Sequence, residues 1–224
     1  MSLRNAAAGL ACIGVLLAVS GAGAASDTAA SPRHLIYLHG RIVQDQQSPR
    51  PRSPRFGYYE LEKILQVFRD RGFVVDGEIR PKTASESESA DRVVAKARRL
   101  LASGVPPGRL TIVGASMGAS IALLTSARLQ NPDVRYCLLG ACLAESVRGL
   151  LAEEGKHPSG RFLAIREASD DLIGPCPTWK DVPSSRSTLV AREIVLHTGL
   201  SHGFLYRPMP EWVNPAAEWA GAAE

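Results

Sequence analysis

The feature that most constrains the fold is an apolar run followed at once by two glycines that flank a serine. Residues 110–113 are rich in β-branched side chains, the pattern Gly114-x-Ser116-x-Gly118 follows, and a largely apolar stretch over 121–129 comes next. This order predicts a strand, a sharp turn and a buried helix. In such a turn the serine sits at a strained backbone position, with its hydroxyl pushed out at the end of the strand. A side chain at either glycine would collide with the neighbouring strand or helix.

The turn admits three interpretations. The strand and helix around it favour Ser116 as a nucleophile. A tight strand-to-helix turn without chemistry is the alternative. A phosphate-binding loop is disfavoured, because no Gly-Lys-Ser or Gly-Lys-Thr follows the glycines.

The first 25 residues are predicted to be a cleaved secretory signal peptide. Arg4 supplies a positive charge, residues 6–19 are apolar and uncharged, and residues 22–24 are small, as a cleavage site requires. A membrane-spanning helix is the competing interpretation, but the apolar run is short and no cluster of charges follows it. No later segment is long and apolar enough to cross a membrane. We therefore expect a secreted or periplasmic protein without a stable membrane span.

The rest of the chain fits one domain. Residues 26–33 are a polar lead-in, and residues 34–224 are enough to enclose a sizeable core. The formal net charge of +4 is modest, and no basic stripe is interleaved with aromatic residues. We therefore expect no nucleic-acid partner. The oligomeric state is left open by the sequence.

The cysteines favour a disulfide rather than a metal site. Cys137, Cys142 and Cys176 follow the leader, and none lies in a Cys-x-x-Cys pattern or beside clustered histidines. We therefore expect neither a metal ion nor a cofactor. An exported chain permits disulfides. Cys142 ends one predicted strand and Cys176 lies just past the turn after the next strand, so we expect these two to pair.

Strand-like and helix-like patterns alternate along the domain. Continuous apolar runs predict strands at 34–38, 73–79, 110–115, 134–139, 161–165 and 193–196. Helical spacing and helix-start signals predict helices at 58–71, 85–101, 121–129 and 212–224, and a loop rich in Pro, Arg and Gln occupies 41–57. Because the strands are continuous apolar runs, we predict a mostly parallel sheet covered by helices on both faces. Ligands bind such sheets at the carboxyl ends of the strands, where Ser116 would lie.

Candidates for a base and an acid also follow predicted strands. A serine hydroxyl needs a neighbouring base to take its proton and a third group to orient that base. His202 follows the last strand between Gly199 and Gly203, which let its loop turn back towards the serine. Asp170 and Asp171 follow the preceding strand, and either carboxylate is placed to accept a hydrogen bond from the imidazole.

Three motifs resemble those of the α/β-hydrolase superfamily, in particular its small lidless serine esterases. They are Leu38-His39-Gly40-Arg41 after the first strand, the turn at 114–118, and Ser201-His202-Gly203. The order Ser, Asp, His is also the one expected of this superfamily. The resemblance covers almost all of the chain after the leader. It implies a single-domain α/β fold with a mostly parallel sheet of about six strands flanked by helices, without a large lid.

The resemblance ranks the two acid candidates. The usual acid motif, Gly-x-x-Asp-x-apolar-apolar-Pro, aligns with residues 167–174 and puts Asp170 at the acid position. Glu167 stands where the motif has glycine, and Gly174 stands where it has proline. Because of these two departures, Asp171 stays an alternative acid.

The resemblance implies a serine hydrolase that cleaves an ester or related acyl bond of a small-molecule acyl substrate, and the leader predicts that it is exported. Ser116 would attack the carbonyl, His202 would move the proton, Asp170 would orient His202, and an acyl-enzyme would form. The backbone N–H groups of Arg41 and Met117 would make the oxyanion hole. A peptidase or a thioesterase would use the same residues. A binding module with a vestigial triad is the alternative from another functional class.

Three arginines lie in the predicted loop after Arg41. Arg50, Arg52 and Arg55 alternate with prolines and serines. Because this loop should border the carboxyl edge of the sheet, its positive charge favours binding of an anionic substrate or a negatively charged surface. A solvated, proline-rich loop without a binding role is the alternative.

Overall fold

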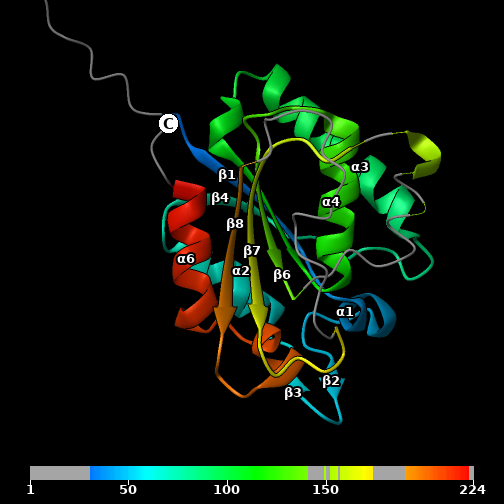
Figure 1. Cartoon of the computed structure of the whole chain (residues 1–224), viewed down its shortest axis with the longest axis vertical. Helices are drawn as coiled ribbons and strands as arrows, with labels where there is room; N and C mark the ends of the chain where they lie inside the picture. The colour runs from blue at the N-terminus through cyan, green and yellow to red at the C-terminus, as the bar shows by residue number, and fades with distance from the viewer. Residues whose placement is uncertain (1–30, 141–148, 150–151, 156, 174–189, 222–224) are drawn as a thin grey trace, which may run out of the picture. The chain divides into compact units, whose positions relative to one another are not determined.

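Six parallel strands form one sheet in the computed structural model, with helices on both faces (Figure 1). The structure describes residues 31–140, 149, 152–155, 157–173 and 190–221, all within one domain. The strands are β1 (Arg33–Leu38), β4 (Phe73–Asp76), β5 (Leu110–Ala115), β6 (Arg135–Leu139), β7 (Arg161–Glu167) and β8 (Val190–Leu196). They lie in the order β4-β1-β5-β6-β7-β8, and every neighbouring pair is parallel. The predicted α/β class and all six predicted strands are confirmed.

The strands are apolar on both faces because each face packs into its own core. In β1, Leu35 and Tyr37 belong to one core, whereas Ile36 and Leu38 belong to the other. The same alternation continues through β5, β6 and β7. Two covered faces account for the continuous apolar runs in the sequence.

Pairs of helices cover the two faces of the sheet (Figure 1). They are α2 (Leu61–Arg69) and α6 (Pro210–Gly221) on one face, and α3 (Glu86–Ala102) and α4 (Met117–Leu129) on the other. α3 begins with a capping box, in which Ser85 Oγ accepts the N–H of Glu88 and the Glu88 carboxylate accepts the N–H of Ser85. These bonds satisfy N–H groups that the first helical turn leaves without an acceptor. The predicted helix start at 85 is therefore confirmed.

The segment 41–57 is not the loop that the sequence predicts. It contains a short helix, α1 (Arg41–Gln46), and two strands of two residues each, β2 (Arg52–Ser53) and β3 (Gly57–Tyr58), which pair antiparallel. A helix of six residues is too short to reveal a helical repeat of apolar positions. Strands of two residues likewise show no alternation of apolar and polar side chains. The periodicity of apolar residues therefore could not predict α1, β2 or β3, because these elements are too short.

Several predicted ends are displaced by a few residues. β1 begins at Arg33, one residue inside the predicted lead-in, and β4 ends at Asp76 rather than at 79. α2 begins at Leu61 rather than at 58, because Tyr58 pairs with Arg52 in the β2–β3 hairpin.

Some predictions concern residues outside the described part of the chain. The signal peptide, Cys142 and Cys176 lie there, so cleavage and the disulfide stay predictions. Cys137 is described: it is buried in β6 with a free thiol. Within the described ranges, no helix is long and apolar enough to span a membrane, no inserted lid is seen, and no group of three or more His, Cys, Asp or Glu residues is placed to hold a metal ion.

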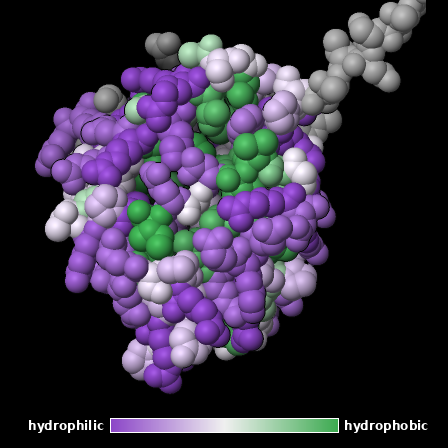
Figure 2. Space-filling model, turned by 180° about the vertical axis from the view of Figure 1, so that it is seen from behind, coloured by the Kyte–Doolittle hydropathy of each residue, from purple (hydrophilic) through white to green (hydrophobic). Residues whose placement is uncertain are grey.

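Most of the surface seen from behind the view of Figure 1 is hydrophilic, with hydrophobic patches between the polar side chains (Figure 2). Three large apolar side chains of the described residues are about half exposed: Tyr58 at 47%, Val74 at 51% and Leu172 at 57%. Tyr58 and Leu172 belong to segments that border the carboxyl edge of the sheet.

Candidate active site

Ser116 lies at the sharp turn between β5 and α4. Its backbone has φ 54° and ψ −120°, a strained conformation for a residue with a side chain. Its N–H donates to the carbonyl of Leu139 at the end of β6, at 2.8 Å. A Cβ on Gly114 would lie 2.3 Å from the Gly118 carbonyl oxygen, and one on Gly118 would lie 1.9 Å from the Leu38 oxygen. Close backbone contacts therefore require both glycines of the motif.

The structure brings Ser116, His202 and Asp170 into one hydrogen-bonded chain at the carboxyl edge of the sheet. His202 Nε2 lies 2.9 Å from Ser116 Oγ, and His202 Nδ1 lies 2.7 Å from Asp170 Oδ2. The other carboxylate oxygen of Asp170 accepts the N–H groups of Leu172 at 3.1 Å and Ile173 at 3.3 Å. His202 and Asp170 are buried, whereas Ser116 is half-buried. With its proton on Nδ1, the ring donates to Asp170 and offers Nε2 to the serine hydroxyl.

Backbone N–H groups flank Ser116 on two sides. Arg41 begins α1 and Met117 begins α4, so neither N–H has an acceptor within its own helix. A Cβ on Gly40 would lie 3.6 Å from Ser116 Cβ, which places the chain just before Arg41 beside the serine. The two residues predicted for the oxyanion hole therefore start two helices whose first residues lie next to Ser116.

Buried polar groups hold the backbone that leads to Arg41. His39 Nδ1 lies 2.9 Å from the Gly40 oxygen, Arg80 N–H donates to His39 Nε2 at 3.1 Å, and Arg80 Nη2 donates to the His39 oxygen at 2.7 Å. Burial and the Arg80 charge lower the pKa of His39 to about 4, so the ring is neutral near pH 7. Arg80 carries no sequence signal for this role, because it meets His39 only through the tertiary fold.

Comparisons with known proteins relate this geometry to a fold. No protein-family model matches the sequence, and no curated protein matches it. Among solved structures, a variant of SOBER1 from Arabidopsis thaliana matches with a TM-score of 0.53 at 13% identity, over 84% of this chain and 98% of that chain. SOBER1 itself matches with a TM-score of 0.51 at 13% identity, over 85% and 98%. XC6422 from Xanthomonas campestris, described as an α/β serine hydrolase without lid, has a TM-score of 0.49 at 13% identity, over 87% and 83%.

The chain has the α/β-hydrolase fold. At these identities the likeness is one of fold, and the chemistry rests on the side chains of the site. In this α/β-hydrolase fold, Ser116 follows β5, Asp170 follows β7 and His202 follows β8.

The second acid candidate, Asp171, has other partners than His202. It accepts hydrogen bonds from Arg55 Nη2 at 2.8 and 2.7 Å and from Ser201 Oγ at 2.5 Å. These bonds, that of Ser201 first, lower the pKa of Asp171 to about 2. Adjacent aspartates of the same loop therefore face in different directions, and the one that meets the imidazole is Asp170.

A third carboxylate near the triad belongs to Glu167, which the sequence marked only as a departure from the acid motif. It ends β7 and is 3% exposed. Its oxygens accept hydrogen bonds from Ser169, Thr198 and Gly199. Burial raises its pKa, but the hydrogen bonds from Thr198 and Ser169 outweigh burial and lower the pKa to about 2. An acidic residue at the end of an apolar strand is unusual, and this pattern is the signal in the sequence that could have pointed to Glu167.

The β2–β3 hairpin packs against the loop of His202. The Phe56 ring lies beside the imidazole, with centroids 6.4 Å apart, and a Cβ on Gly203 would lie 2.9 Å from Phe56 Cδ1. Phe56 also packs on Tyr206, with centroids 5.3 Å apart. The hairpin therefore borders the candidate site, as expected of this segment.

The three predicted substrate-binding arginines all lie on or next to this hairpin, in different surroundings. Arg55 is paired with Asp171, so its charge is balanced. The Arg50 guanidinium lies over the Tyr58 ring, 4.1 Å from its centroid. Arg52 is exposed. Arg50 and Arg52 thus carry the positive charge that has no salt-bridge partner among the described residues.

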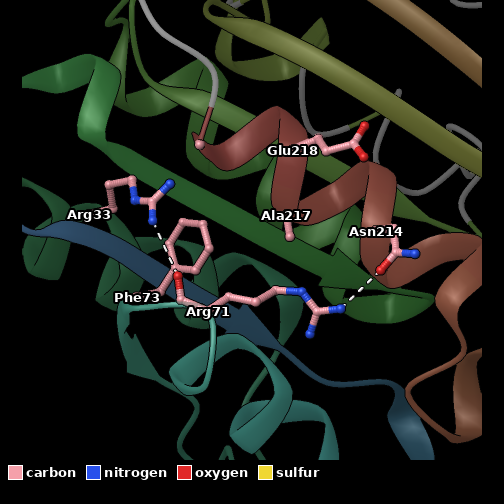
Figure 3. A pocket seen from close by; sticks show the side chains of 7 residues that line it. Arg33, Arg71, Phe73, Asn214, Ala217 and Glu218 are labelled. Carbon is pink, nitrogen blue, oxygen red and sulfur yellow. Dashed lines mark hydrogen bonds between the residues drawn. The ribbon is translucent and has the colours of Figure 1, made fainter.

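A separate hollow of about 450 Å³ lies at the other ends of the strands (Figure 3). Its lining includes Arg33 and Phe73, the first residues of β1 and β4. Arg33 donates to the Arg71 oxygen at 3.2 Å, and Arg71 donates to Asn214 Oδ1 at 2.9 Å. These contacts join α6 to the strand starts and to the end of α2. The hollow is therefore remote from Ser116.

Proposed function

We propose that the chain is an exported serine hydrolase that cleaves an ester or related acyl bond. The observation that carries the proposal is the hydrogen-bonded chain from Asp170 through His202 to Ser116, at a strained turn of the α/β-hydrolase fold. A serine hydroxyl is a weak nucleophile by itself. A histidine oriented by a carboxylate activates it.

In the proposed reaction, Ser116 Oγ attacks the acyl carbonyl while His202 Nε2 takes the hydroxyl proton. Asp170 holds the Nδ1 proton in place and stabilises the imidazolium. The imidazolium then protonates the leaving group, which departs and leaves an acyl-enzyme. Water attacks the acyl-enzyme as His202 takes a proton from it, and the same proton returns to Ser116 Oγ when the acid product leaves.

The backbone N–H groups of Arg41 and Met117 are the proposed donors to the oxyanion. Both start helices, so each is an N–H without an internal acceptor at the positive end of a helix. Loss of one such donor typically lowers the rate by about 100- to 1000-fold. The hydrogen bonds of His39 and Arg80 support this role, since they fix the backbone that aims the Arg41 N–H.

We propose a carboxylic ester of a small molecule as the substrate, with no cofactor. A peptidase or a thioesterase would use the same groups, because acyl specificity depends on pocket shape. Arg50 and Arg52 are the proposed source of any preference for anionic substrates. Hydrolysis of matched neutral and anionic esters at several salt concentrations tests this preference, and equal rates for the pair would remove it.

The decisive experiment is covalent labelling with a fluorophosphonate probe. The folded protein should be labelled at Ser116, Ser116→Ala should not be labelled, and Ser103→Ala at the exposed end of α3 should be labelled like the wild type. Labelling that persists in Ser116→Ala would contradict the assignment. Absence of labelling in the folded wild type would instead favour a binding module that uses the fold without catalysis.

Export is tested by the N-terminus of the protein recovered from the periplasm or the medium. A signal peptide predicts that the recovered chain starts near residue 25. A chain that keeps Met1 and stays inside the cell would contradict export and leave the proposed chemistry untouched.

A further inference from the structure

Two loops carry the proposed base and acid, and the distance between them depends on how these loops are joined. The acid loop follows β7 and holds Asp170, and the histidine loop follows β8 and holds His202. β7 and β8 are paired up to Glu167 and Leu196. Beyond that point the sheet no longer sets the spacing of the two loops, so side chains must do it.

The Glu167 carboxylate lies between the two loops and accepts hydrogen bonds from both. Its Oε1 accepts from Ser169 N at 3.2 Å, Ser169 Oγ at 2.8 Å and Gly199 N at 3.3 Å. Its Oε2 accepts from Thr198 N at 2.9 Å and Thr198 Oγ1 at 2.8 Å. Ser169 belongs to the acid loop, whereas Thr198 and Gly199 belong to the histidine loop. One buried side chain thus receives donors from the two segments that must meet.

The connection extends to the residue next to the proposed base. Ser169 Oγ donates to Glu167 and accepts the N–H of Ser201 at 3.1 Å. Ser201 has φ 50°, a left-handed conformation that a serine seldom adopts without support. Because Ser201 directly precedes His202, its backbone sets the direction from which the imidazole approaches Asp170.

We propose that Glu167 is a positioning residue that clamps the acid loop to the histidine loop and so holds His202 against Asp170 and Ser116. This inference rests on the proposed function of Ser116. It assigns a role to the departure from the acid motif, because a glycine at position 167 would offer no acceptor to these five donors.

The role requires a carboxylate. An ionised carboxylate only accepts hydrogen bonds, and both of its oxygens can accept more than one, so each can serve donors of a different loop. Glutamine has one accepting oxygen and an NH₂ that itself donates. In Glu167→Gln, either the Thr198 donors or the Ser169 and Gly199 donors would face an NH₂, and the two loops would move apart. A misplacement of about 1 Å in a catalytic constellation costs on the order of 100-fold in rate.

The test compares Glu167→Gln with Glu193→Gln. Glu193 is the control because it lies on neighbouring β8, is exposed and pairs with Arg166 on the surface. For the folded proteins, kcat and KM for a p-nitrophenyl ester and the rate of fluorophosphonate labelling are measured. Glu167→Gln should lower kcat and the labelling rate by about 10- to 100-fold and change KM less than about twofold. Glu193→Gln should match the wild type.

A second variant, Ser169→Ala, decides the matter if Glu167→Gln does not fold. It removes the hydroxyl that links Glu167 to Ser201, and it should lower kcat by about three- to tenfold with little change in KM. Wild-type kcat in folded Glu167→Gln or in Ser169→Ala would overturn the positioning role alone. An unlabelled wild type would overturn the proposed function, and the positioning role with it.

Discussion

Two carboxylates flank Asp170 in the sequence, Glu167 at the end of β7 and Asp171 in the acid loop, and they reach the same low pKa by different means. Glu167 and Asp171 both have a pKa of about 2. Glu167 is 3% exposed and is held by neutral N–H and O–H donors, whereas the Asp171 side chain is 58% exposed and is paired with a cation, Arg55. A low pKa therefore does not by itself tell which acid matters for the fold.

The two carboxylates differ in how far they are exposed to solvent. Water and salt screen the pair of Asp171 with Arg55, and exposed pairs contribute little to stability. The Glu167 side chain itself is buried, whereas its donors Ser169 and Gly199 are exposed and Thr198 is half-buried. Solvent therefore screens the hydrogen bonds of Glu167 less than it screens the Asp171 pair, and losing this acceptor is more costly. We expect the buried carboxylate to set the geometry of the site and the exposed one to add little.

The largest effect is expected at the carboxylate between them. Asp170→Asn keeps the shape of the side chain but favours the wrong tautomer of His202, so kcat should fall by about 10⁴-fold. Asp171→Asn is the matched control, one residue away, and should keep nearly all activity. Measuring kcat of both variants and the wild type on one ester tests this prediction. If Asp171→Asn lost the activity and Asp170→Asn kept it, the acid assignment would be reversed.

The next effect is on stability at Glu167 and depends on pH. The pKa is lowered from 4.5 to about 2, so the ionised carboxylate stabilises the fold above pH 4.5, and this contribution is lost as the pH falls through about 2. Glu167→Gln should therefore be less stable than the wild type at pH 7, by about 1–3 kcal/mol for the lost acceptor, and nearly equal to it at pH 2.

Urea unfolding of both proteins at several pH values measures this difference directly. Taking the difference cancels the other titrating groups, which the two proteins share. A gap that stays constant from pH 7 to pH 2 would show that the carboxylate charge is not what stabilises the loops. The exposed Glu193→Gln variant again serves as the control and should show no pH-dependent gap.

A smaller effect is expected when single donors are removed from each acid. Thr198→Val keeps the shape but deletes the hydroxyl that donates to Glu167, and it should cost about 1–2 kcal/mol. Ser201→Ala deletes the hydroxyl that donates to Asp171 in a more exposed setting and should leave the urea midpoint unchanged. Equal losses in the two variants would erase the contrast between the buried and the exposed carboxylate.

The fold could be predicted to the extent that its signals are local. Strands buried on both faces are continuous apolar runs, and α3 starts at a capping box within four residues, so both are visible in the sequence. α1 and the β2–β3 hairpin could not be predicted, because elements of two to six residues are too short to show a period of apolar side chains.

The residues of the site also separate into those with a local signal in the sequence and those without one. Ser116, Asp170 and His202 each follow a strand within a short motif, so their meeting could be anticipated from a parallel sheet. The roles of Glu167 and Arg80 could not, because they depend on contacts with residues 31 and 41 positions away in the sequence. The choice between Asp170 and Asp171 likewise depends on the conformation of the loop.

The smallest effect is expected from the exposed pair itself. Asp171→Asn removes the ion pair with Arg55 and should lower kcat/KM by less than about threefold. Because the pKa of Asp171 is about 2, the pair is intact above pH 3.8 and is lost as the pH falls through about 2, so this small ratio should be constant across neutral pH. Adding about 1 M salt to the wild type should mimic the variant, since screening acts on exposed charges.

Arg55→Gln should give the same loss of kcat/KM as Asp171→Asn, and the double variant should show no further loss, because both substitutions remove the same ion pair. A loss of about 100-fold or more in either variant, at any salt, would show that the exposed carboxylate also positions His202, and the contrast with Glu167 would no longer hold.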